Sequence, residues 1–192
     1  MEETKGSIII VTAPSGAGKS TLLKHVMQEF PQLKFSVSAT TRSPREAEID
    51  GVHYHFITKD EFLSKIDSEQ FIEWEQVYDY YYGTLKSEIE KCAKAGETII
   101  LEIEVNGAMN VKRLYPQSNM IFVMPPDKQV LIERLISRNT ESPEDLQKRI
   151  ERAEMEFSME KYFEYKVVND DLETAKKQII EIVKQIIAEK GK

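Results

Sequence analysis

The sequence contains only one cysteine, Cys92, in 192 residues. A single cysteine cannot form an intrachain disulfide, so an apolar core must stabilise the fold. We expect Cys92 to be an inert thiol packed within a helix near residues 88–95. Histidine is also scarce, and His25, His53 and His55 lie at no spacing typical of zinc ligands. The composition therefore excludes a disulfide scaffold and gives no support to a zinc site.

Long apolar runs and an excess of basic residues are missing as well. No stretch approaches the run of about 18 apolar residues that a membrane-spanning helix needs, and the first five residues do not resemble a signal peptide. The 26 basic and 33 acidic residues give a net charge of −7, which disfavours general binding to nucleic acid or to membrane surfaces. We expect a cytoplasmic protein that binds neither, and the sequence leaves its oligomeric state open, with a homo-oligomer among the options.

The chain alternates apolar runs of strand length with helical patterns. Strands are expected at 7–12, 98–103, 120–124 and 166–168. Helices are expected at 19–30, 84–95, 106–114, 127–137 and 172–189. Thr58 begins a capping box that opens a further short helix, and Ser142 opens another. This alternation predicts an α/β fold whose parallel sheet is flanked by helices.

Two segments depart from the alternation. Between about 35 and 84, short aromatic segments such as 52–57 and 71–78 have the pattern of antiparallel strands, which predicts an inserted subdomain. The arginine-rich segment 134–152 contains a polar turn between two helices and could move as a lid. We expect one domain over residues 6–185, whose core comprises 6–34, 98–130 and 160–190.

A glycine-rich loop follows the first expected strand. Its residues are Ala13, Pro14, Ser15, Gly16, Ala17, Gly18, Lys19, Ser20 and Thr21. The loop matches G-x-x-x-x-G-K-[ST] except at its first position, where Ala13 replaces glycine. Backbone N–H groups, a helix N-terminus and the charge of Lys19 together form a nest for phosphates. The loop predicts a nucleoside triphosphate site, and the alternative is a small-residue turn before an ordinary helix.

A second anion site is indicated by Arg42 and Arg45, which lie three residues apart in one loop. Guanidinium groups bind phosphate oxygens in pairs, and Tyr54 and Tyr82 could add phenolic donors. The alternative is a solvated basic loop. Together with the glycine loop, this arginine pair predicts two phosphorylated substrates.

A base pocket is indicated by Glu73, which by strand alternation shares a face with Phe71 and Glu75. One carboxylate can accept from both N1–H and the N2 amine of guanine, whereas adenine has no N2 amine. Thr84 could donate to the guanine O6. The alternatives are an exposed glutamate on an edge strand and, for residues 80–84, a packed aromatic turn.

Glu102 and Glu104 lie at the C-terminal end of the expected strand 98–103, where open α/β sheets bind their ligands. The spacing of two residues points both carboxylates the same way. They could reach a Mg²⁺ ion, directly or through water, or complete the base pocket. The alternative is a simple strand end.

The lid segment carries Arg134 and Arg138 on one expected helix and Arg149 and Arg152 on the next. Several positive charges could close over a transferred phosphoryl group. The alternative is ion pairing with glutamates on the helix surface.

These motifs together resemble the guanylate kinase family, nucleoside monophosphate kinases that make GDP from GMP and ATP. The matching segments are 13–21, 36–45, 71–74, 81–84, 101–107, 138–141 and 167–172. The resemblance extends from about Gly6 to Lys184. It implies a P-loop nucleoside monophosphate kinase fold with a five-stranded parallel core sheet, an inserted, mainly antiparallel GMP-binding subdomain and a helical lid.

The resemblance also implies roles for individual residues. The GMP phosphate would be held by Arg42, Arg45, Tyr54 and Tyr82, and the base by Ser38, Glu73, Thr84 and Glu104. ATP would be bound by the glycine loop, with Lys19 and Ser20 serving ATP and Mg²⁺, Glu102 reaching the metal, Arg138 and Arg149 acting from the lid, and Asn169 near the adenine. The catalytic residues would be Lys19, Arg42, Arg138 and Arg149.

By the same resemblance, the chain is expected to phosphorylate GMP and also dGMP by in-line transfer, within purine nucleotide metabolism and GMP recycling. It departs from the family pattern at Ala13, Glu102, Glu104, Asn106 and Asn139. Two other functions stay open: a guanylate-kinase-like interaction module without catalysis, which the intact Gly18-Lys19-Ser20 disfavours, and a kinase acting on a different phosphorylated acceptor.

Overall fold

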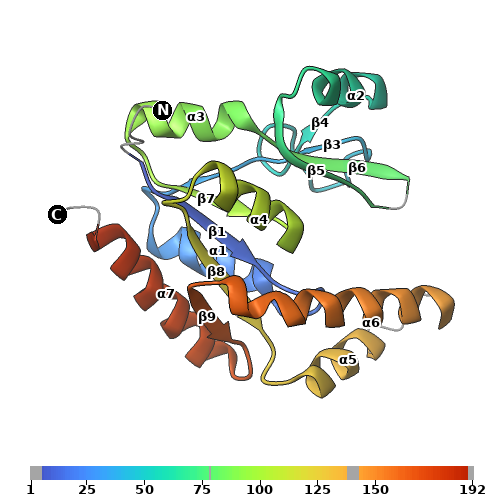
Figure 1. The fold of residues 1–192 in the computed structure, drawn as a ribbon, viewed down its shortest axis with the longest axis vertical. Coiled ribbons are helices and arrows are strands. Elements are labelled where there is room, and N and C mark those ends of the chain that lie inside the picture. The colour runs from blue at the N-terminus through green and yellow to red at the C-terminus, as the bar shows by residue number, and fades with distance from the viewer. Residues whose placement is uncertain (1–5, 78, 138–142, 190–192) are drawn as a thin grey trace.

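A five-stranded parallel sheet forms the centre of the computed structural model, which describes residues 6–77, 79–137 and 143–189 (Figure 1). In spatial order the strands are β2 (Lys34–Phe35), β7 (Ile99–Glu102), β1 (Ile8–Thr12), β8 (Asn119–Met124) and β9 (Tyr165–Val168). In the central strand β1, Ile9 pairs with Ile100 on one side and with Asn119 on the other. Every residue of β1 is buried, as expected for a parallel strand covered on both faces.

Helices cover both faces of this sheet. They are α1 (Lys19–Glu29) and α7 (Leu172–Glu189) on one face, and α3 (Lys86–Ala95) and α4 (Val105–Leu114) on the other. Alternate residues of β1 pack on opposite faces, because Ile9 contributes to the cluster with α1 and α7 and Ile10 to the cluster with α3 and α4. Cys92 lies buried in α3, as predicted. The predicted α/β class and its parallel sheet are confirmed.

A second, four-stranded sheet lies beside the start of α3 in Figure 1 and forms the inserted subdomain, residues 39–85. Its strands are β4 (His55–Phe56), β3 (Ala39–Thr40), β6 (Tyr80–Leu85) and β5 (Phe71–Val77), in that spatial order. Helix α2 (Lys59–Asp67) begins with the predicted capping box and stacks Phe62 on Phe71, with ring centroids 4.3 Å apart. The subdomain therefore has a small aromatic core of its own.

The remaining helices form an arm that lies across from the inserted subdomain (Figure 1). They are α5 (Lys128–Ile136), α6 (Pro143–Ser158) and the short 3₁₀ helix η1 (Met159–Tyr162). Leu131 and Leu135 of α5 pack against Ala153 of α6. Among the described residues, none of the helices has the length and apolar character needed to cross a membrane.

Two details of the inserted subdomain correct the sequence predictions. The expected antiparallel strand over 52–57 is wrong, because only His55–Phe56 forms a strand and it pairs parallel to β3. Gly51, with φ of 73°, turns the chain just before it. Such a short strand after a turn produces no alternation that a sequence pattern could show.

The second correction concerns the face of β5. Its pairing with β6 shifts register between Phe71 and Glu73, which marks a bulge. Phe71 consequently packs on Phe62 of α2, whereas Ile72 joins the core cluster beside the main sheet. The prediction that Phe71 shares a face with Glu73 and Glu75 is therefore wrong, because strict alternation does not continue through a bulge.

Candidate active site

The glycine loop joins the end of β1 to the start of α1. Gly16 and Gly18 have φ values of 93° and 87°, a conformation that other residues adopt only with strain. Gly18 is the N-cap of α1, so the positive end of the helix dipole lies at the loop. Ala13 is buried in the core, and among the described non-glycine residues only Glu69 has a positive φ. The alanine in place of the first motif glycine therefore introduces no backbone strain.

Asn169 fastens this loop to the end of β9. Its side chain is buried, and Nδ2 donates a 2.7 Å hydrogen bond to the carbonyl oxygen of Ala17. The Asn169 carbonyl oxygen accepts from Arg134 Nη1 of α5 at 2.9 Å. A side chain at Gly18 would collide with the Asn169 amide. Asn169 is thus a clamp on the loop, and its proximity to adenine stays a prediction.

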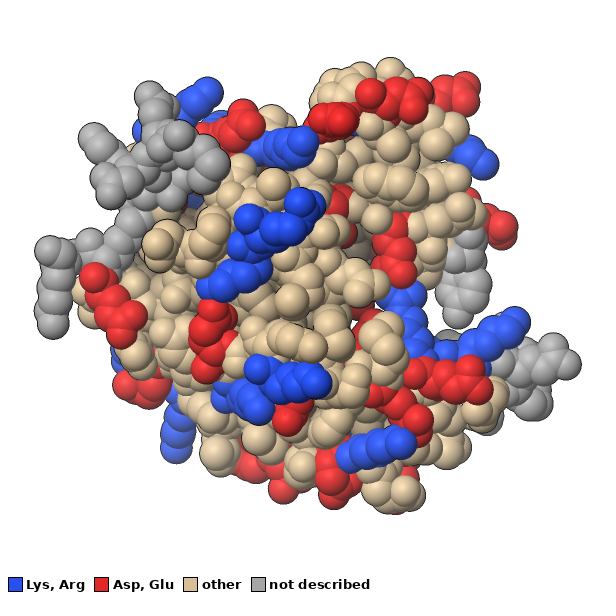
Figure 2. Space-filling view, viewed as in Figure 1, with Lys and Arg blue, Asp and Glu red and all other residues tan. Residues whose placement is uncertain are grey.

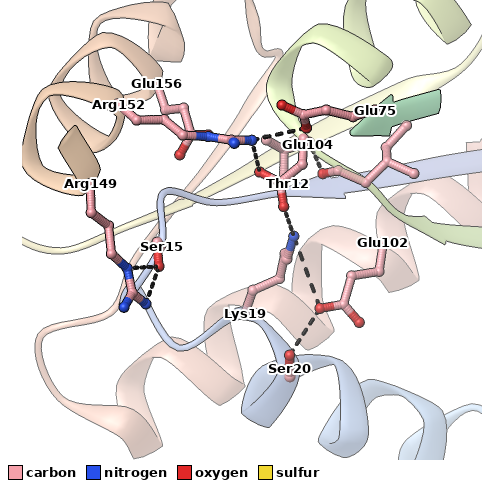
Figure 3. A network of polar contacts seen from close by, with 11 residues as sticks. Thr12, Ser15, Lys19, Ser20, Glu75, Glu102, Glu104, Arg149, Arg152 and Glu156 are labelled. Atoms are coloured by element: carbon pink, nitrogen blue, oxygen red, sulfur yellow. Dashed lines mark hydrogen bonds and ion pairs between the residues drawn. The ribbon is translucent and has the colours of Figure 1, made fainter. Parts of the chain in front are cut away.

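Lys19 lies between two carboxylates, Glu102 at the end of β7 and Glu104 at the start of α4 (Figure 3). Its Nζ is 4.0 Å from Glu102 Oε1 and 3.9 Å from Glu104 Oε1. Ser20 Oγ donates to the same Glu102 oxygen at 2.9 Å. The two carboxylates therefore converge on the ammonium group, as their spacing predicts, and they offset its charge within the loop.

Ser20 and Glu102 offer adjacent hard oxygen donors, the kind that Mg²⁺ prefers. Mg²⁺ keeps several waters and usually takes only one or two protein ligands beside substrate phosphates. Over residues 6–77, 79–137 and 143–189, no group of three or more His, Cys, Asp or Glu side chains could hold a metal ion. The donor set fits a magnesium ion that arrives with a nucleotide.

Arg42 is held by a carboxylate of its own loop. Glu48 accepts two hydrogen bonds from the guanidinium, at 2.7 and 2.9 Å, and the ring of Tyr54 lies 5.4 Å from Arg42 Cζ. Arg42 lowers the pKa of Glu48 to about 2, and the hydrogen bonds that Arg42 donates to Glu48 raise the pKa of Arg42, with Tyr82 adding to that rise. The Arg45 side chain is exposed, while its backbone N–H donates to Glu48 at 2.8 Å. Sequence reasoning missed Glu48, for which no local signal exists.

Glu73 and Thr84 form a hydrogen-bonded pair across β5 and β6. The fully buried Thr84 donates to Glu73 Oε1 at 2.6 Å. On its other side, the carboxylate lies against α4, since a Cβ at Gly107 would stand 2.8 Å from Glu73 Oε2. Burial raises the pKa of Glu73, and the hydrogen bond from Thr84 partly opposes the rise. Ser38 is half-buried in the segment between β2 and β3. Glu73 is therefore a partly desolvated acceptor between the inserted subdomain and the core.

Arg149 brings α6 to the glycine loop. Its Nε and Nη2 lie 3.2 and 2.8 Å from Ser15 Oγ (Figure 3). Arg138, Asn139 and the predicted helix start at Ser142 lie outside the described residues. Arg149 therefore lies at the glycine loop, as the lid prediction requires.

Arg152 belongs to a further cluster of charged side chains, and the sequence did not reveal its partners in that cluster. Its Nη2 lies 2.9 Å from Glu75 Oε2 and 3.8 Å from Glu104 Oε2, and its Nε lies 3.0 Å from Glu156 Oε1. Burial, together with the nearby charge of Glu104, raises the pKa of Glu156 to about 7. Two features of the sequence could have indicated this cluster. Glu75 lies two residues after Glu73, and Arg152 and Glu156 are four residues apart on one helix.

These acidic and basic side chains line a pocket of about 150 Å³ between β5, the start of α4 and α6. In the space-filling view the surface is hollowed between the inserted subdomain and α6, and side chains of both signs meet there (Figure 2).

The five-stranded parallel sheet, the glycine loop, the inserted subdomain and the helical arm define a nucleoside monophosphate kinase of the P-loop class. The guanylate kinase family model matches residues 5–186. The guanylate kinase of Desulfitobacterium hafniense (strain Y51) is 44% identical over 91% of this chain and 88% of its own length. That of Helicobacter pylori (strain ATCC 700392 / 26695) is 41% identical over 94% and 88%.

A solved structure is also similar, the crystal structure of guanylate kinase from Anaplasma phagocytophilum. It has a TM-score of 0.71 and 27% identity, and the match covers 95% of this chain and 87% of that one. The chain belongs to the guanylate kinase family. It is accordingly an enzyme, a nucleotide-binding kinase.

Proposed function

We propose that this enzyme transfers the γ-phosphoryl group of ATP to a phosphate oxygen of GMP, and of dGMP, with the help of Mg²⁺. The observation that carries the proposal is the placement of two cations on different units, Lys19 at the end of the core sheet and Arg42 on the inserted subdomain. The product GDP would serve purine nucleotide metabolism and GMP recycling, and a cytoplasmic location stays part of the proposal.

On the core side, the glycine loop and Lys19 would hold the ATP phosphates. Ser20 and Glu102 would hold Mg²⁺, directly or through water, and the ion supplies charge neutralisation beside the phosphates when it is bound. Arg149 already reaches Ser15 of the loop, so it can approach the same phosphates from α6. Arg138 would join it from the lid.

On the subdomain side, Arg42, Arg45, Tyr54 and Tyr82 would hold the GMP phosphate. The base would be lined by Ser38, Glu73, Thr84 and Glu104. The Glu73 carboxylate is positioned by Thr84, so it can accept the N1–H and N2 donors of guanine. Adenine would leave that carboxylate unpaired, which costs more than the lost hydrogen bonds alone.

The chemical step needs charge stabilisation rather than a general base. The attacking atom is an anionic phosphate oxygen that carries no proton to be removed at neutral pH. The difficulty is the repulsion between two anions, which Lys19, Arg42 and Arg149 would offset as charge spreads over the transferred group. Closure of α6 would exclude water and so limit hydrolysis of ATP.

A coupled ADP-release assay with ATP tests this function. GMP, dGMP, AMP, CMP and UMP are compared, each with Mg²⁺ and with excess EDTA. We expect turnover with GMP and dGMP only, abolished by EDTA. Absence of ADP with every acceptor would support a non-catalytic interaction module, and preference for another nucleotide would identify a kinase with a different acceptor.

A further inference from the structure

Arg152 contacts carboxylates from three parts of the molecule (Figure 3). Glu75 belongs to β5 of the inserted subdomain, Glu104 begins α4 on the core, and Glu156 lies one turn further along α6 itself. The contact with Glu75 spans 77 positions of the chain at 2.9 Å. A single guanidinium on the lid helix therefore reaches both units between which a phosphoryl group would pass.

The surroundings of this contact are polar and open. The pocket of about 150 Å³ beside it is lined by residues of β5, α4 and α6. The Arg152 and Glu75 side chains are 39% and 35% exposed. By contrast, α6 meets α5 through the buried apolar cluster that contains Leu135 and Ala153. An apolar seam makes a permanent contact, whereas a half-exposed ion pair can break and re-form as the two units move.

Glu104 links this ion pair to the glycine loop. Its Oε2 lies 3.8 Å from Arg152, and its Oε1 lies 3.9 Å from Lys19. Glu156, 3% exposed, accepts from Arg152 Nε at 3.0 Å and so fixes the direction of the guanidinium. Glu156, on the same helix, therefore orients the Arg152 guanidinium toward Glu75 and Glu104.

We propose that Arg152 is a positioning residue that holds the lid helix α6 against the inserted subdomain through Glu75, and so sets the fraction of molecules in the closed arrangement. The inference rests on the proposed kinase function, because its consequence for turnover is a change in GMP use. Apparent affinity for a substrate falls in proportion to the fraction of molecules competent to bind it. A partly exposed ion pair changes that fraction by about two- to five-fold.

The kinetic test is a double-mutant cycle with Arg152→Gln, Glu75→Gln and the combined variant. We expect each single change to raise the KM for GMP by about two- to five-fold with little change in kcat. The combined variant should be no worse than either single one, since both remove the same contact. If Arg152 acted on GMP directly, Glu75→Gln would leave KM unchanged, and that result would overturn the proposal.

The chain offers matched controls. Lys128 of α5 and Glu154 of α6 form an ion pair at 2.9 Å that stays within the arm. Lys128→Gln and Glu154→Gln change the net charge by the same amounts as Arg152→Gln and Glu75→Gln. They should leave the KM for GMP within about two-fold of the parent. Equal effects from the control pair would mean that charge alone is responsible and would refute a specific contact.

A distance measurement separates this inference from the proposed function, because it needs no turnover. Spin labels are placed at exposed positions on α2 and α6 through Asp60→Cys and Lys148→Cys, in a background with Cys92→Ala. Pulsed electron paramagnetic resonance on the nucleotide-free protein should show longer distances for Arg152→Gln than for the parent or for Lys128→Gln. Identical distributions in all three would overturn the proposal even if the enzyme phosphorylates GMP as expected.

Discussion

Lys19 and Arg42 belong to two regions that orient a cation in different ways. Lys19 follows a loop whose shape depends on Gly16 and Gly18, on buried β1 and on the Asn169 clamp. Arg42 stands in a loop of the inserted subdomain, where Glu48 and Tyr54 orient it. Backbone geometry therefore sets the position of Lys19, whereas side-chain pairing sets the position of Arg42.

This difference matters because backbone geometry resists local change more than an exposed ion pair does. The loop is fastened to the end of a parallel sheet whose central strands β1 and β8 are buried. Among the described residues, the subdomain's own apolar cluster has three buried members, Ala39, Phe62 and Phe71. We therefore expect the core to act as a rigid platform and the subdomain to adapt its position to its ligand.

The largest effect is expected from Lys19→Ala. Removing a preorganised cation from the transferred phosphates should lower kcat by about 10³-fold, as measured by ADP release. GMP binding should survive, because Arg42 lies on the other region. Lys24→Ala, an exposed change on the same helix, is the control and should retain activity. Unchanged turnover in Lys19→Ala would show that the cation held by the glycine loop does not act on the transferred phosphates.

A smaller effect is expected from Glu73→Gln, which tests whether the inserted subdomain binds the guanine base. The amide cannot accept both guanine donors, so kcat/KM for GMP should fall by about 10²-fold. Use of AMP should fall much less, because adenine never satisfied the carboxylate. The ratio of the two kcat/KM values is the measurement. An unaltered ratio would show that Glu73 does not read the base.

The smallest effect is expected from Glu156 of α6, which lines the pocket between the two regions. Burial and the nearby charge of Glu104 raise the folded-state pKa of Glu156 to about 7, above the usual value of about 4.5 for an unfolded glutamate. Folding therefore binds a proton between these two pH values. Stability should fall as pH rises from about 4.5 to 7, and the full cost is present above 7. Glu156→Gln should therefore stabilise the protein at pH 8 by about 2 kcal/mol and at pH 4.5 by much less. Urea unfolding at both pH values measures this difference, and an equal gain at both would contradict the assignment.

The core could be predicted from the sequence because its signals are local. Uninterrupted apolar residues predict β1, and the expected helix 172–189 coincides with α7. The glycine loop follows from residue types at fixed spacing. The short strand β2 was not located, since two residues carry no periodicity.

The inserted subdomain and the pairings at the site could not be predicted in the same way. The bulge after Phe71 reverses the face of that residue without any change in composition. Arg42 and Glu48, or Arg152 and Glu75, become partners only once the chain has folded. Charged residues in loops and on half-exposed strands resemble solvated ones until their neighbours are known.

The most direct measurement is isothermal titration calorimetry of two variants, each with both nucleotides. Lys19→Ala should lose binding of ATP with Mg²⁺ and keep binding of GMP, whereas Arg42→Ala should lose GMP and keep ATP. Loss of the same nucleotide in both variants, or of neither, would contradict the existence of two separate anion sites.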